Sequence, residues 1–167
     1  MADHPMAVLL LRDTLPPPDP RSALALVRGL APTDLATLRA LSGAAAWPLS
    51  FGLGATAFRA DMLSTPMAEA GSLADAAYWW PEARGAVAAH RAQLPISVAP
   101  VPQDGDVAGA VAAARRVMRI AAALAGVAGD AALGVAWTSS GALWPVPTFV
   151  AEARLPLALP IWVSLDP

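Results

Sequence analysis

The sequence has 167 residues, of which 56% are hydrophobic and 14% charged, and this predicts one globular domain over residues 1–167. It contains no cysteine and no lysine, which excludes thiol nucleophiles, cysteine-ligated metals, disulfides and lysine Schiff bases. The formal net charge of −2 gives no general attraction to nucleic acid, so we expect no nucleic-acid partner. With no cysteine and only two histidines, we also expect no metal and no cofactor.

The apolar composition does not predict a membrane protein. Glycine and proline interrupt the two longest charge-free runs, 40–58 and 131–151, so neither is a spanning helix. The apolar run 6–11 follows Asp3 and lacks the basic start of a signal peptide. We therefore expect a cytoplasmic protein that has no membrane partner.

The first half of the chain predicts alternating strands and helices. A short apolar run at 6–12 is typical of a strand buried on both faces, and a proline-rich loop follows at 15–20. A helix is expected over 21–28. Leucines at helical spacing predict another helix over 32–43, and 49–63 predicts either two strands or one bent strand.

The second half predicts further helices, strands and a hairpin. The expected elements are a helix from 73 that breaks at Pro81 and resumes to about 90, a strand at 94–101, a long helix over 107–127, a strand at 132–139 with a turn at 140–141, a short helix near Pro147 and a last strand at 159–165. The pattern favours an α+β fold with two layers, a mixed β-sheet and helices packed mainly on one face.

His90 and Ser139 are the candidate catalytic residues. His90 shares a small apolar helix face with Ala83 and Val87, so it is either a buried imidazole that hydrogen-bonds the backbone or a general base. Ser139 lies in the sequence "TSSG", which is ordinary turn chemistry and lacks the G-x-S-x-G pattern of a catalytic serine. A structural role is the commoner one for each.

Aromatic and arginine side chains are the candidate binding residues. The aromatic group comprises Tyr78, Trp79, Trp80, Trp137, Trp144 and Trp162. Core packing is their default role, but Trp80, Trp137 and Trp144 could line a ligand pocket or a protein-binding surface, and Trp144 is the best candidate for exposure. Three arginines share one side of the long helix, where they are either solvated or bind an acidic partner or a phosphate group: Arg115, Arg116 and Arg119.

The segments "WWPEARGAVAAHRAQLPISV", "GVAWTSSGALWPVPTFV" and "LPIWVSL" resemble the bacterial domain-of-unknown-function family 4261 over about residues 66–165. That family's pattern has a helix ending in His, a second His three residues later, an aromatic-Ser-Ser turn and an apolar strand with Trp. Gln93 stands where the second His would be, which argues against a two-histidine metal site. The chain ends soon after "IWVSL", where similar proteins continue, so the resemblance implies a missing C-terminal segment. It supplies no activity.

Two functional hypotheses follow. The leading one is a non-catalytic intracellular module that binds a protein partner or itself, and the low charge favours a homo-oligomer. The alternative is a small-molecule-binding protein or enzyme with a pocket formed by four residues: His90, Trp80, Trp137 and Ser139. The alternative requires His90 to face a cavity, with a carboxylate within hydrogen-bond reach.

Overall fold

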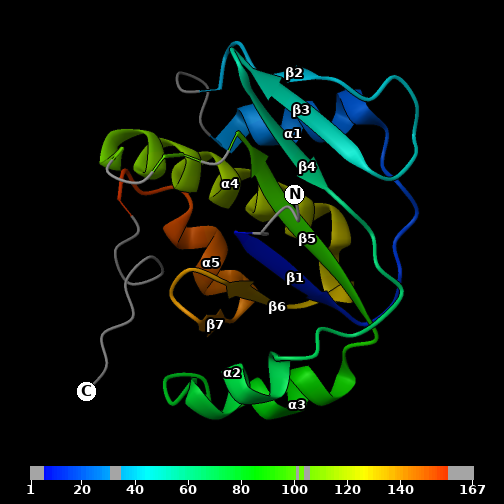
Figure 1. The fold of residues 1–167 in the computed structure, drawn as a ribbon. Helices are drawn as coiled ribbons and strands as arrows, with labels where there is room; N and C mark the ends of the chain where they lie inside the picture. The colour runs from blue at the N-terminus through cyan, green and yellow to red at the C-terminus, as the bar shows by residue number, and fades with distance from the viewer. Residues whose placement is uncertain (1–5, 31–34, 101, 104–105, 158–167) are drawn as a thin grey trace.

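A seven-stranded sheet forms the centre of the computed structural model, which describes residues 6–30, 35–100, 102–103 and 106–157 (Figure 1). The strand order is β2-β3-β4-β5-β1-β6-β7, and every pairing of these strands is antiparallel. The strands are β1 (Ala7–Leu11), β2 (Arg39–Ala40), β3 (Leu49–Leu53), β4 (Thr56–Ala60), β5 (Ala92–Ala99), β6 (Ala132–Trp137) and β7 (Ala142–Trp144). The helices are α1 (Pro20–Leu30), α2 (Ala70–Ala76), α3 (Ala83–Ala89), α4 (Val107–Ala128), the short 3₁₀ helix η1 (Gly129–Ala131) and α5 (Val146–Glu152).

Strand β1 is buried on both faces, as its unbroken apolar sequence predicts. Leu9 belongs to the larger apolar core, whereas Val8 and Leu10 belong to the smaller one. Successive side chains of a strand point to opposite faces, so this one strand supplies both cores. Its register is fixed from both sides, because Leu9 pairs with Leu94 of β5 and with Val135 of β6.

Helices cover the two faces unequally. α1, α4 and α5 pack on one face and form the larger core, while α2 and α3 pack on the other face, over β1, β6 and β7 (Figure 1). The predicted α+β class is confirmed. Two details differ from the prediction, since the sheet is antiparallel rather than mixed and α2 and α3 add a partial third layer. Tight turns join β3 to β4 and β6 to β7, and such short connections can join only antiparallel strands.

The helix predicted over 32–43 is wrong for residues 35–43. The start of the predicted range, 32–34, lies outside the described residues. Leu35 and Leu38 lie in a turn, where the Leu38 N–H donates to the Leu35 carbonyl at 3.0 Å. The chain then enters β2, which pairs with β3. Leu35 and Leu38 are fully buried, so their spacing reflects core packing rather than helical periodicity.

The other described elements occur where the sequence predicts them, with shifted ends. The stretch 49–63 contains two strands, and Gly54 adopts φ +60° at the hairpin turn between them. Pro81 separates α2 from α3, and Asp19 caps α1 by accepting the Ser22 N–H at 2.9 Å. The strand predicted at 159–165, with Trp162, lies outside the described residues.

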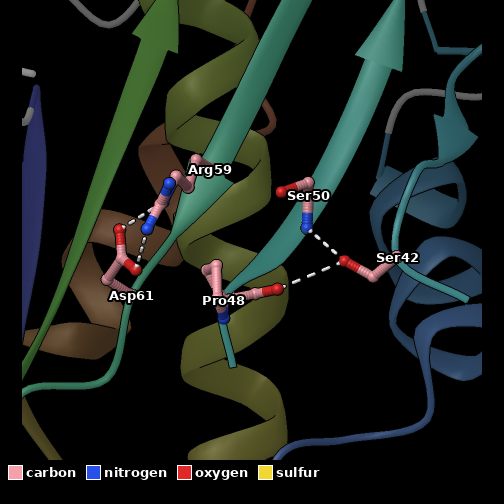
Figure 2. Close-up of polar contacts among 5 residues, drawn as sticks. All are labelled: Ser42, Pro48, Ser50, Arg59 and Asp61. Carbon is pink, nitrogen blue, oxygen red and sulfur yellow. Dashed lines mark hydrogen bonds and ion pairs between the residues drawn. The ribbon is translucent and has the colours of Figure 1, made fainter. Parts of the chain in front are cut away.

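Polar contacts occur on the half of the sheet around β3 and β4, which α2 and α3 do not reach (Figure 2). Ser42 Oγ accepts the Ser50 N–H at 2.8 Å and donates to the Pro48 carbonyl at 3.2 Å. Arg59 forms a two-pronged ion pair with Asp61, at 2.8 and 3.0 Å, and its side chain is half exposed. These contacts satisfy backbone and side-chain polar groups on the half of the sheet that no helix of the second face covers.

Candidate functional site

His90 follows the last residue of α3 and is only 5% exposed. Its Nδ1 is hydrogen-bonded to the Val87 carbonyl, and its Nε2 lies 3.0 Å from the backbone nitrogen of Met67. An imidazole that donates from Nδ1 and accepts at Nε2 is the neutral Nδ1–H tautomer. The ring therefore ties α3 to the segment before α2, and backbone groups engage both of its nitrogens.

The structure does not bring His90 and Ser139 together. The residue after His90, Arg91, donates its N–H to the Leu11 carbonyl, which places His90 beside the last residue of β1. Ser139 is exposed in the turn after β6, and the residue before it, Thr138, donates its N–H to Met6 at the opposite end of β1. The length of β1, about 3.3 Å per residue, therefore separates them.

The two tryptophans of the hypothetical pocket lie on opposite faces of the sheet. Trp137 is 1% exposed in the larger core, where its ring lies 6.3 Å from that of Phe149. Trp80 packs against the smaller core on the side of α2 and α3. The pocket expected between these tryptophans, His90 and Ser139 therefore has no counterpart in this geometry.

Trp80 lies directly over Gly134 of β6. A Cβ atom at position 134 would lie 2.9 Å from Cη2 and 3.1 Å from Cζ3 of the Trp80 ring. Only a residue without a side chain permits this close approach of an indole to a strand. Gly134 thus determines how deeply Trp80 is seated and, with it, the position of the chain around residues 77–82.

Three aromatic side chains meet at β7, which is one of the two edge strands of the described sheet: Tyr78, Trp79 and Trp144. We call them the aromatic edge cluster. Trp79 stacks on Trp144 with ring centroids 5.2 Å apart, and Tyr78 meets Trp79 edge-on at 4.9 Å. Tyr78 is 73% exposed and Trp79 is 39% exposed, so the cluster presents aromatic surface to solvent.

The local sequence explains why these rings point outward. Ala77 and Ala83 are buried in the smaller core on either side of the break at Pro81. The Trp80 N–H donates to the Ala77 carbonyl at 2.9 Å, which closes a tight turn between α2 and α3. Trp80 packs inward beside these alanines, whereas Tyr78 and Trp79, on the other side of the turn, remain exposed.

Trp79 also covers part of the sheet edge. Its indole Nε1–H donates to the backbone carbonyl of Leu143 at 3.2 Å. A free edge strand presents unpaired backbone groups that can pair with another chain, and proteins commonly block such edges. The bond from Trp79 thus occupies one backbone acceptor of β7.

The three arginines of α4 are less exposed to solvent than the side chains of a typical charged surface. Arg119 is only 5% exposed, and its Nε–H donates to the Ala153 carbonyl at the end of α5, at 3.4 Å. Arg115 and Arg116 are half-buried. The described residues that line a hollow of about 190 Å³ beside them are Ala112, Arg115, Arg116 and Arg119.

A second hollow of about 270 Å³ adjoins the first at the start of α4 and shares Ala112 and Arg116 with it. Its other described lining residues come from the ends of β4 and β5 and from the first turns of α4 with the segment before it: Thr56, Val98, Pro100, Pro102, Gln103, Asp106, Gly109 and Ala113. Asp106 caps α4, because its Oδ1 accepts the Gly109 N–H at 2.9 Å.

Sequence reasoning missed the roles of three residues. A glycine inside the apolar strand "ALGVAW" signals close approach of another group, which here is Trp80 over Gly134. The sequence does not distinguish Trp79 from the other tryptophans, although only its position allows the bond to Leu143 at the sheet edge. No local pattern signals the role of Trp47, whose indole donates to the Leu15 carbonyl at 2.9 Å and so anchors the proline-rich loop.

Within the described ranges, no helix combines the length and apolar character needed to span a bilayer. In the same residues, no three histidine or acidic side chains gather closely enough to hold a metal ion. No protein-family model, curated protein or solved structure gave a significant match to this chain. The resemblance to family 4261 therefore stays a prediction.

Proposed function

We propose that this chain is a non-catalytic interaction module that associates with a second copy of itself through the aromatic edge cluster. The observation that carries the proposal is the exposure of Tyr78 and Trp79 beside the edge strand β7. Exposed tyrosine and tryptophan are the side chains most enriched among residues that dominate the binding energy of protein interfaces.

The charge distribution supports a second copy as the partner. The net charge of −2 produces little repulsion between two identical chains. Exposed charged side chains flank the cluster in sequence: Arg84 and Asp75 form an intrachain ion pair at 2.8 Å, and Glu82 adds a further acidic group. A two-fold interface places the same patch against itself, so a patch that carries both signs can be self-complementary.

The proposal is tested by sedimentation velocity on the purified chain, from about 5 to 500 μM, which spans the micromolar affinities of transient interfaces. We expect a reversible monomer–dimer equilibrium. Tyr78→Ala should weaken dimerisation by about tenfold or more, because truncating an aromatic residue that dominates an interface costs about 2 kcal/mol or more. Tyr78 is largely exposed, so this change should leave the fold intact.

Leu26→Ala is the matched control, since Leu26 is a half-exposed apolar residue on α1, on the opposite face of the sheet. It should dimerise like the wild type. A wild-type chain that stays monomeric at the highest concentration would contradict the proposal. Equal dimerisation of the Tyr78→Ala and wild-type chains would show that another surface mediates association.

A further inference from the structure

The arginines of α4 form a second candidate site, in a different part of the fold from the aromatic edge cluster (Figure 1). Arg115 and Arg119 are four residues apart, and Arg116 and Arg119 are three apart, so all three are neighbours on one helix side. Like charges at these spacings destabilise a helix. A bound anion would reverse that effect.

The surroundings of the arginines strengthen any contact with an anion. Arg119 is more than nine-tenths buried, and α5 fixes its guanidinium through the bond to Ala153. A fixed and partly desolvated guanidinium attracts an anion more strongly than a mobile one in bulk water. The hollow beside Arg115, Arg116 and Arg119 is large enough, at about 190 Å³, for a compact oxyanion.

The adjoining hollow has a different character. Val98, Pro100 and Pro102 give it apolar walls, while Gln103 and Asp106 add an amide and a carboxylate. A carboxylate would repel an anionic group there but would accept hydrogen bonds from hydroxyl groups. Because Arg116 lines both hollows, a ligand with one anionic end and one hydroxylated end could occupy them together.

We infer that this pair of hollows binds a small phosphate monoester of a hydroxylated molecule, such as a sugar phosphate. The phosphate lies against the arginines, whose forked guanidinium groups suit bidentate contact with phosphate oxygens. The hydroxylated part lies toward Gln103 and Asp106. A polyanion fits less well, because the chain carries a net charge of −2 and the arginines line a hollow rather than an extended surface.

The test is an NMR titration of the whole chain with glucose 6-phosphate, inorganic phosphate and glucose, each up to about 20 mM, a range suited to weak millimolar binding. We expect saturable shifts of the amides of residues 106–119 with glucose 6-phosphate. Inorganic phosphate should bind more weakly, and glucose should cause no saturable shift. Arg116→Gln should weaken glucose 6-phosphate binding by about tenfold or more.

Two further variants make the result specific. Arg39→Gln removes an exposed arginine from β2, away from α4, and should bind like the wild type. Arg116→Lys keeps the charge and should fold normally, yet bind several-fold more weakly because it lacks the fork. The inference is overturned if glucose 6-phosphate gives no saturable shift, if Arg116→Gln binds it equally, or if a ten-residue thymidine oligonucleotide binds more tightly.

Discussion

Replacing Gly134 with alanine should destabilise the fold by forcing Trp80 away from the sheet. The new Cβ would lie 2.9 Å from the Trp80 ring and 3.3 Å from the Trp144 carbonyl, whereas ordinary contacts lie between 3.4 and 4 Å. The strand cannot retreat, because Gly134 pairs with Leu10 of β1 and the next residue pairs with β7. The ring must therefore move.

The magnitude follows from two opposing effects. Overpacking a well-packed site typically costs about 1–3 kcal/mol. Removing a glycine from a strand restores roughly 0.5–1 kcal/mol, because the unfolded chain loses conformational freedom. We therefore expect Gly134→Ala to lower the free energy of unfolding by about 1–2 kcal/mol, measured by urea denaturation followed by circular dichroism and tryptophan fluorescence.

Gly126→Ala is the matched control for this substitution. Gly126 is exposed in α4, and no atom lies within 4 Å of its added Cβ. Because alanine is the better helix former, this change should stabilise the chain by about 1 kcal/mol. The two glycine-to-alanine changes should therefore have opposite signs.

A double-mutant cycle isolates the contact itself. Trp80→Phe shortens the ring that overlies Gly134, so Gly134→Ala should destabilise the Trp80→Phe chain less than it destabilises the wild type. A Gly134→Ala chain as stable as the wild type would refute the reasoning. So would an equal effect of Gly134→Ala in both backgrounds, since it would place the strain somewhere other than the Trp80 ring.

Two further predictions concern polar groups. His90→Ala should lower the free energy of unfolding by about 1–3 kcal/mol, because it leaves the Met67 N–H without its acceptor. His90→Gln can supply an acceptor and should cost less. A long-range ¹H–¹⁵N correlation spectrum should show the Nδ1–H tautomer of His90, and the Nε2–H tautomer would contradict the geometry. Hydrogen bonds from the backbone and hydroxyl of Ser22 hold the pKa of Asp19 below its usual value of 3.8, so the stabilisation from this cap is present above pH 3.8 and lost as the pH falls through the lowered pKa. In thermal unfolding, Asp19→Asn should keep the cap and lose this acid dependence. An unchanged acid profile would count against the cap.

The sequence predicts correctly those helices and strands whose conformation is set by residues close to them in the chain. The strand at 6–12, the break at Pro81 and the long helix capped by Asp106 each depend on nearby residues. The error over 32–43 arises because pairing with β3, a long-range interaction, decides the conformation there. The antiparallel sheet order is likewise set by contacts between distant strands.

The candidate sites were predictable only as residue types. The sequence identifies tryptophan and arginine as binding residues, but it cannot say that Trp137 faces the larger core while Trp80 faces the smaller one. It favoured Trp144 for exposure, yet Trp144 is half-buried and Tyr78 is far more exposed. Burial of Arg119 depends on α5, which begins 27 residues further along the chain.

Order at the aromatic edge cluster is what makes it suitable as an interface. Exposed side chains usually lose rotamer freedom when they bind, which costs about 0.5–1.5 kcal/mol for each large side chain. Trp79 has already lost that freedom, because it stacks on Trp144, meets Tyr78 edge-on and donates to Leu143. The folding energy that seats Trp80 on Gly134 thus also fixes the adjacent Trp79 at the sheet edge, and in the proposed dimer the second copy would meet a preformed aromatic surface.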